Sequence, residues 1–284
     1  MNRLTHQPAG IVLVLLIAAG VLFPGCVSRP PEDQAPVIPP ETTMLMDFSD
    51  FKTNGAAEVS TDGLQPQAQT ATRSNWGWAA LKVLFWNTVI TTTVAVPVGA
   101  YAESFNHEPM QLEDGTWVWA YDSTVAGVLY SAELQAKAVN GDIEWNMFIS
   151  KEGEFSDVNW FSGVSNLVGT AGTWTLNMDP LDPKPFVLIE WHRNPTEGTS
   201  DIKYTNIIPD DPENGGYIFF AITDETPLDT EYDIFNKGQD NLTQIEWSRD
   251  TKAGHIRDLL RYDDEDWHCW NELFEDIDCS TAGF

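Results

Sequence analysis

One long apolar stretch, Trp76 to Tyr101, constrains the fold of this chain more than any other feature. Its single charge is Lys82, and its polar residues do not gather on one side of a helical wheel. A helix that is apolar nearly all round is either buried in a protein or spans a membrane. Pro97 should end or kink it. We therefore expect a helical segment over 75–96, straight to about Ala95.

Three structures are open to this stretch. It is about long enough to span a membrane, but Lys82 and the threonine run at 91–93 are unfavourable in lipid. The β-branched second half could also form a strand. We predict a helix buried inside the protein, which needs no membrane.

The chain after this stretch has the pattern of short antiparallel strands over 115–250. Val128–Val139 and Asp142–Ser150 alternate apolar and polar residues on either side of Asn140-Gly141, the strongest short-range hairpin signal. Trp117, Trp119 and Tyr121 share one face of an earlier strand. The remaining strand candidates are Phe155–Phe161, Thr173–Met178, Phe186–Trp191, Ile202–Ile208, Tyr217–Ile222, Glu231–Phe235 and Leu242–Trp247.

This spacing predicts a mainly β fold, an antiparallel meander forming a barrel or half-barrel around one buried apolar helix. We expect a single domain over 42–284. Residues 41–51 contain an apolar run that could be a first strand, and 52–74 has the composition of a flexible connection.

The N-terminus has the features of an export signal. Arg3 precedes an uncharged apolar core, Gly10 to Phe23, which is too short for a comfortable membrane span. Leu22 to Cys26, LFPGC, resembles the lipobox of bacterial lipoproteins, with Pro24 in place of the usual small residue. The resemblance implies a signal peptide over 1–25, cleavage before Cys26 and lipidation of Cys26. It covers only these 26 residues.

A tether is expected to follow. Residues 26–41 are rich in proline and have no apolar periodicity, so they predict an extended link between the membrane anchor and a folded domain. Val27 and Ser28 lack the acidic residue that retains enterobacterial lipoproteins in the inner membrane. The resemblance therefore implies a cell-envelope protein anchored in the outer rather than the inner membrane.

The charge balance limits the partners. The chain has 15 Lys and Arg against 43 Asp and Glu, a net charge of −28. Such a chain repels nucleic acids and anionic lipid head groups, so we expect no nucleic-acid partner. A well-solvated surface or adaptation to salt explains the excess equally well.

Twelve tryptophans are many for this length. Alternation places most of them with the apolar residues that fill a core. The other interpretation is a ligand platform, because tryptophan also lines lipid grooves and stacks on sugars. The candidate ligand-binding residues are Trp76, Trp78, Trp86, Trp117, Trp119 and Trp145.

The acidic C-terminal segment, 263–284, contains Cys269 and Cys279. Two cysteines in an exported chain should form a disulfide. Trp270, Leu273, Phe274 and Ile277 also fit a helical stripe, but a continuous helix would hold the cysteines about 15 Å apart, too far for a disulfide. We predict the disulfide, with the chain doubling back.

Metal and catalytic motifs are not recognisable. The turns at Asp179–Asp182 and Asp210–Glu213 could bind calcium but lack EF-hand spacing, and His268 with the two cysteines matches no common zinc site. Glu190 beside His192 is one of many carboxylate neighbours in an acidic chain. We predict no metal, no cofactor and no catalytic residue.

Three functions remain, from different classes. A binding protein for a lipid or other apolar ligand predicts a cavity beside the 75–96 helix. The architecture is similar to that of the half-barrel carriers of lipoprotein localisation, an analogy of fold alone. A structural or protein-interaction lipoprotein, meeting an envelope protein, predicts a filled core. A secreted carbohydrate-active enzyme requires two carboxylates facing each other across a tryptophan-lined cleft.

Overall fold

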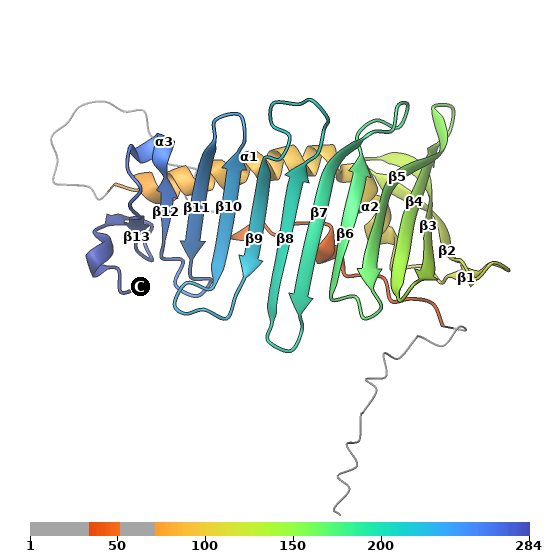
Figure 1. Ribbon diagram of the computed structural model, residues 1–284, viewed down its shortest axis with the longest axis horizontal. Coiled ribbons are helices and arrows are strands. Elements are labelled where there is room, and N and C mark those ends of the chain that lie inside the picture. The colour runs from red at the N-terminus through yellow and green to blue at the C-terminus, as the bar shows by residue number, and fades with distance from the viewer. Residues whose placement is uncertain (1–33, 52–71) are drawn as a thin grey trace, which may run out of the picture.

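A computed structural model describes residues 34–51 and 72–284 (Figure 1). The expected signal peptide, Cys26, the first part of the tether and most of the 52–74 connection lie outside the described residues.

The described chain is built on one antiparallel sheet of 14 strands. The order in the sheet is the order in the sequence, so every connection joins neighbours and the fold is the predicted meander. The sheet is open, like a half-barrel, and its edges are the two-residue strands β1 and β14. The strands are β1 (Met110–Gln111), β2 (Trp117–Val125), β3 (Val128–Val139), β4 (Asp142–Lys151), β5 (Phe155–Asn166), β6 (Ala171–Asn177), β7 (Pro185–Asn194), β8 (Thr199–Asn206), β9 (Tyr217–Ile222), β10 (Thr230–Asn236), β11 (Asn241–Trp247), β12 (Gly254–Asp258), β13 (His268–Trp270) and β14 (Asp276–Ile277).

Most of the predicted strands are present in the structure. The predicted hairpin is β3 and β4, and Asn140 and Gly141 both have positive φ, 54° and 99°, as a tight two-residue turn requires. Each strand candidate between Phe155 and Trp247 is found, most of them longer than expected. The sequence patterns did not predict β1, β13 and β14, which have two or three residues each, or β12, whose only large apolar residue is Ile256.

One face of the sheet, here called the inner face, carries the core. Its tryptophans pack over glycines of the paired strand. Trp174 lies opposite Gly163, and Trp191 lies opposite Gly172. A Cβ on Gly172 would come within 2.6 Å of the Trp191 ring. The indoles therefore fill the room that the glycines leave, and the rings of Trp174 and Trp191 stack at 6.4 Å.

Residues 41–51 do not form the strand that the apolar run predicted. They contain two 3-10 turns, η1 (Glu41–Thr43) and η2 (Ser49–Phe51), and lie against the inner face instead of pairing with an edge. Met44 and Met46 are buried there, and the Tyr204 hydroxyl donates to Met44 O at 2.6 Å and accepts from Met46 N at 3.2 Å. Side chains of the sheet thus satisfy backbone groups that a strand partner would otherwise satisfy.

The end of the predicted tether also packs on the domain. Ala35 and Ile38 contact the core, and the Tyr101 hydroxyl donates to Pro39 O at 2.5 Å.

Two helices replace the single predicted one. They are α1 (Ser74–Thr93) and α2 (Ala95–Ser104), bent by 71° at Val94. Pro97 lies in the first turn of α2, where its missing N–H costs no helical bond. In Figure 1, α1 lies behind the sheet and crosses the strands from β12 toward β6.

The helix α1 is buried on one side only, which corrects the expectation of a helix enclosed by protein. Ala79, Val83 and Ile90 are buried, whereas Leu81 and Phe85 are 57% and 62% exposed. Within residues 34–51 and 72–284, no single helix is long and apolar enough to cross a membrane, although the bent pair α1 and α2 passes by length and composition together.

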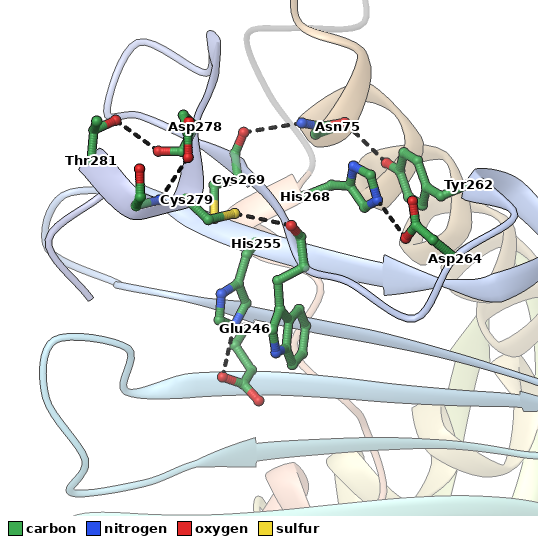
Figure 2. Close-up of a disulfide and its surroundings, with 12 residues drawn as sticks. Asn75, Glu246, His255, Tyr262, Asp264, His268, Cys269, Asp278, Cys279 and Thr281 are labelled. Carbon is green, nitrogen blue, oxygen red and sulfur yellow. Dashed lines mark hydrogen bonds and ion pairs between the residues drawn. A yellow bond between two sulfur atoms is a disulfide. The ribbon is translucent and has the colours of Figure 1, made fainter.

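The C-terminal hairpin, residues 268–277, holds the start of α1 (Figure 2). Cys269 and Cys279 form the predicted disulfide, with Cα atoms 5.2 Å apart. The helical stripe at 270–277 was the wrong pattern, since these residues form β13, a turn and β14. The chain doubles back, and that is what brings the two cysteines together. The short helices α3 (Leu259–Tyr262) and η4 (Cys279–Thr281) flank the hairpin.

Candidate ligand cavity beneath α1

A cavity of about 570 Å³ lies between the C-terminal half of α1 and the inner face of the sheet. The contacts that position α1 are made with η2, β12, β13 and β14 and with α2 at its other end. The C-terminal half of α1, from Lys82 onward, therefore spans the cavity. The lining residues are Lys82, Phe85, Trp86, Val89, Ile90, Thr93, Val94, Met178, Phe186, Val187, Tyr204, Asn206, Ile208, Glu213, Gly216, Ile234, Phe235, Asn236 and Thr243.

The cavity is partly open, and its walls are mainly apolar. Phe85, Val89 and Met178 line it and are also exposed to solvent, at 62%, 39% and 49%. These three side chains come from α1 and from the residue that follows β6, so they mark the opening between the helix and that rim of the sheet.

One positive charge lies in the wall. The Lys82 ammonium is 3.3 Å from Asp258 Oδ2 and 5.0 Å from the centre of the Trp78 ring. Asp258, at the end of β12, is 1% exposed. The pair anchors the middle of α1 to the sheet at the edge of the cavity.

Asp258 is saturated with donors. Its Oδ2 accepts from Trp78 Nε1 and Thr243 Oγ1, both at 2.9 Å, and its Oδ1 accepts from Asn241 Nδ2 at 3.0 Å. Burial raises the pKa of Asp258, but these hydrogen bonds and the Lys82 charge together bring it below its ordinary value. A carboxylate held by several donors stays ionised although it is buried.

A negative charge lines another part of the wall. Glu213, in the β8–β9 connection, accepts a hydrogen bond from Gly238 N at 3.2 Å. Among the cavity residues, Lys82 and Glu213 are the two that carry charge, and Asn206, Asn236 and Thr243 supply further polar groups.

The structure separates the six predicted ligand tryptophans. Trp86 lines the cavity. Trp76 is buried against Phe274, with ring centres 4.7 Å apart, and Trp78 donates to Asp258. The other three lie on β2 and β4, toward the opposite end of the sheet, where the rings of Trp119 and Trp145 are 6.1 Å apart; they are Trp117, Trp119 and Trp145.

Carboxylates with raised pKa values lie away from the cavity. Burial, and then neighbouring acids, raise the pKa of Glu231, and burial raises that of Asp233. Both alternate on β10 with the inward Tyr232, so they belong to the outer face. The only carboxylate among the cavity residues is Glu213, so the described part of the chain does not place two carboxylates across this cavity.

The residues considered as zinc ligands make other interactions. Cys269 and Cys279 are joined in the disulfide, and the His268 ring stacks on Tyr262 while Nε2 contacts Asp264 Oδ1 at 3.0 Å (Figure 2). Within the described ranges, no group of three or more His, Cys, Asp or Glu is placed to hold a metal ion.

Sequence reasoning missed the Lys82–Asp258 pair and the position of Tyr204, which lines the cavity and bonds to the backbone of Met44 and Met46. The one available signal was Lys82 itself, the single charge in a long apolar stretch, because a charge in such a place needs a partner. Nothing in the sequence identified Asp258 among 43 acidic residues as that partner.

Comparison with known proteins does not add an assignment. A scan against protein-family models, a search of curated proteins and a search of solved structures each found no match.

Proposed function

We propose that this protein is a membrane-anchored binding protein of the cell envelope that holds a lipid or other apolar molecule in the cavity beneath α1. The observation that carries the proposal is the cavity itself, because a filled core would leave no space beside the helix. Small-molecule sites typically have volumes of about 300–1,000 Å³, and 570 Å³ lies within that range.

The chemistry of the walls supports an apolar ligand. The α1 side of the cavity consists of Phe85, Trp86, Val89, Ile90 and Val94 around Lys82 and Thr93. Burying apolar ligand surface against such walls is favourable by about 25 cal/mol for each Å² removed from water.

The placement of α1 supports its action as a lid. The C-terminal hairpin holds the start of α1, and the bend into α2 holds its end. The C-terminal half of α1 covers the cavity. Small shifts of that half would open the space for a ligand without breaking the sheet.

Native mass spectrometry tests the proposal. The full chain is purified in a mild detergent, freed of it, and its bound molecules are extracted with organic solvent. We expect a co-purifying lipid or apolar molecule in a defined ratio. A clean apo mass, together with no uptake of a neutral fluorescent probe such as N-phenyl-1-naphthylamine, would contradict the proposal and favour a protein-interaction role.

The membrane anchor is a separate part of the proposal and depends on Cys26. Labelled fatty acid should be incorporated into the wild-type chain and not into a Cys26→Ser variant. Fractionation of a bacterial host should place the labelled chain in the outer membrane. Retention of the whole leader, without label, would contradict the lipoprotein assignment.

A further inference from the structure

We infer that the ligand is a single-chain amphiphile with an anionic head group, and that Lys82 binds that head group. This inference rests on the proposed function, because it concerns what occupies the same cavity. Three observations carry it: the fixed position of the Lys82 ammonium, its spare hydrogen-bond donors and the second cation, Arg261, beside the same Trp78 ring.

The ammonium of Lys82 is held in place. It contacts Asp258 Oδ2 at 3.3 Å and lies 5.0 Å from the centre of the Trp78 ring, whose Nε1 donates to the same carboxylate. Lysine usually loses much side-chain freedom when it binds a ligand. Here that freedom is already lost in the protein, so a head group would meet a positioned charge.

The contact with Asp258 leaves hydrogen-bond donors of the Lys82 ammonium free for a ligand. An ammonium has three donors, and its contact with Asp258 engages one of them. Asp258 meanwhile accepts from Trp78, Asn241 and Thr243 and from the backbone N–H of Arg261. Its negative charge is therefore shared among several donors, and Lys82 retains donors for an acceptor in the cavity that it lines.

A second cation lies beside Trp78. Arg261 places its guanidinium carbon 5.0 Å from the centre of the same ring, and no carboxylate of the described residues forms an ion pair with it. Lys82 and Arg261 thus both lie against the Trp78 ring beside the buried Asp258 carboxylate, while Asp264 and Asp276 lie close enough to Tyr262 to act on its hydroxyl.

The rest of the cavity selects the other end of the ligand. Beyond Lys82 the α1 wall is Phe85, Trp86 and Val89, which suits a hydrocarbon chain. Glu213 is the other charge in the lining and would repel a second anionic group. A volume of about 570 Å³ fits one ligand of ordinary small-molecule size. A long-chain carboxylate has one hydrocarbon chain for the apolar wall and a single negative charge for Lys82. It therefore suits a cavity that holds one ligand and would repel a second anionic group.

Displacement of N-phenyl-1-naphthylamine from the full chain tests the inference. The competitors are palmitate and its methyl ester, which share the chain and differ in charge, and lysophosphatidic acid, which offers a phosphate in place of the carboxylate. The protein is compared as wild type, Lys82→Gln, Lys82→Arg and, as a surface control, Lys137→Gln.

We expect palmitate to compete about tenfold better than the ester in wild type, as a charge-assisted hydrogen bond provides. That advantage should disappear in Lys82→Gln, return in Lys82→Arg and persist in Lys137→Gln. Stronger competition by the lysophosphatidic acid would identify a phosphate head group as the source of the anion. Unfolding midpoints measured alongside separate an effect of Lys82→Gln on binding from an effect on folding.

The experiment distinguishes failure of the proposed function from failure of the proposed role of Lys82. If the neutral probe does not bind wild type at all, the proposed function fails. If the probe binds, but palmitate and its ester compete equally, or Lys82→Gln leaves the difference intact, the cavity binds apolar ligands and the role of Lys82 is refuted. If Lys82→Gln lowers the unfolding midpoint, Arg261→Gln, outside the cavity lining, must reduce the palmitate advantage for the inference to stand.

Discussion

The carboxylate of Asp276 caps the first turn of α1 from a position about 200 residues later in the chain. Its Oδ1 accepts from Asn75 N at 2.9 Å, and its Oδ2 accepts from Ser74 N at 3.0 Å. Arg73, the residue at the N-cap position, makes no side-chain cap bond. The C-terminal hairpin therefore supplies the cap that the local sequence lacks, and Asn75 Nδ2 donates back to Cys269 O at 3.0 Å.

Removing this cap should destabilise the domain. We expect Asp276→Ala to lower the free energy of unfolding by about 0.5–2 kcal/mol, the usual cost of losing an N-cap acceptor. Urea denaturation followed by circular dichroism measures the change. Glu272→Ala, an exposed carboxylate of the same hairpin, serves as the control. Equal stabilities of the two variants would show that the cap contributes nothing.

Loss of the Asp258 charge should weaken the attachment of α1 and flatten the acid response. We expect Asp258→Asn to lower the free energy of unfolding at pH 7 by about 1.5–3 kcal/mol, since hydrogen bonds to a charged group are lost. The folded pKa lies below the ordinary value, so this contribution is present above about pH 4 and is lost as pH falls through the folded pKa.

Urea titrations at pH 7, 5, 4 and 3 test both parts, with the exposed Asp224→Asn as the control. The wild type should lose more stability than Asp258→Asn over the acid range. Parallel curves for the two proteins would exclude a contribution from this carboxyl.

The attachment of residues 44–46 should depend on one hydroxyl. We expect Tyr204→Phe to cost about 1–3 kcal/mol, because Met46 N–H and Met44 C=O would be left buried without that partner. The control is Tyr217→Phe, whose half-buried ring packs against Phe235. A loss of the same size in the control would contradict this assignment.

Alkaline pH should release the same segment. Burial raises the pKa of Tyr204 well above its ordinary value, against the opposing hydrogen bond from Met46, and burial raises the pKa of Tyr101 and Tyr232 as well. A raised folded pKa gives stability that is full below about pH 10 and is lost as pH rises beyond it. Phenolate absorbance near 295 nm should therefore rise together with unfolding, and in Tyr204→Phe the loss of stability above pH 10 should be smaller.

Close packing of indole on glycine should make the inner face intolerant of a methyl group. A Cβ at Gly172 would lie 2.5 Å from Val164 O and 2.6 Å from Trp191 Cζ2, so we expect Gly172→Ala to cost about 1–3 kcal/mol. Gly77→Ala meets nothing within 4 Å inside α1 and should stabilise by about 0.5–1 kcal/mol. Thermal unfolding of both variants checks the opposite signs, and a stabilised Gly172→Ala would refute the packing argument.

Local patterns were sufficient where each residue had one plausible environment. The alternation on either side of Asn140-Gly141 identified both strands and their turn because one face had to be buried and the other solvated. The same logic failed for 41–51. Its alternation is real, with Met44, Met46 and Phe48 all buried, but it reflects burial against the inner face and not pairing.

Contacts between residues far apart in the sequence could not be predicted from local patterns. Asp258 had no distinguishing neighbour in the sequence, and Asp276 was one acid in an acidic segment. The helical stripe at 270–277 competed with the disulfide, and distance decided between them.

The sequence by itself determined that this chain forms a β-meander with an apolar helix, because periodicity, turn residues and apolar runs act between near neighbours. Only the tertiary structure decided that α1 leaves a cavity beneath it, with Lys82 in the wall and Asp258 behind it. A cavity is the space between elements far apart in the chain, and its volume depends on how closely their side chains pack. No pattern within one element encodes that distance.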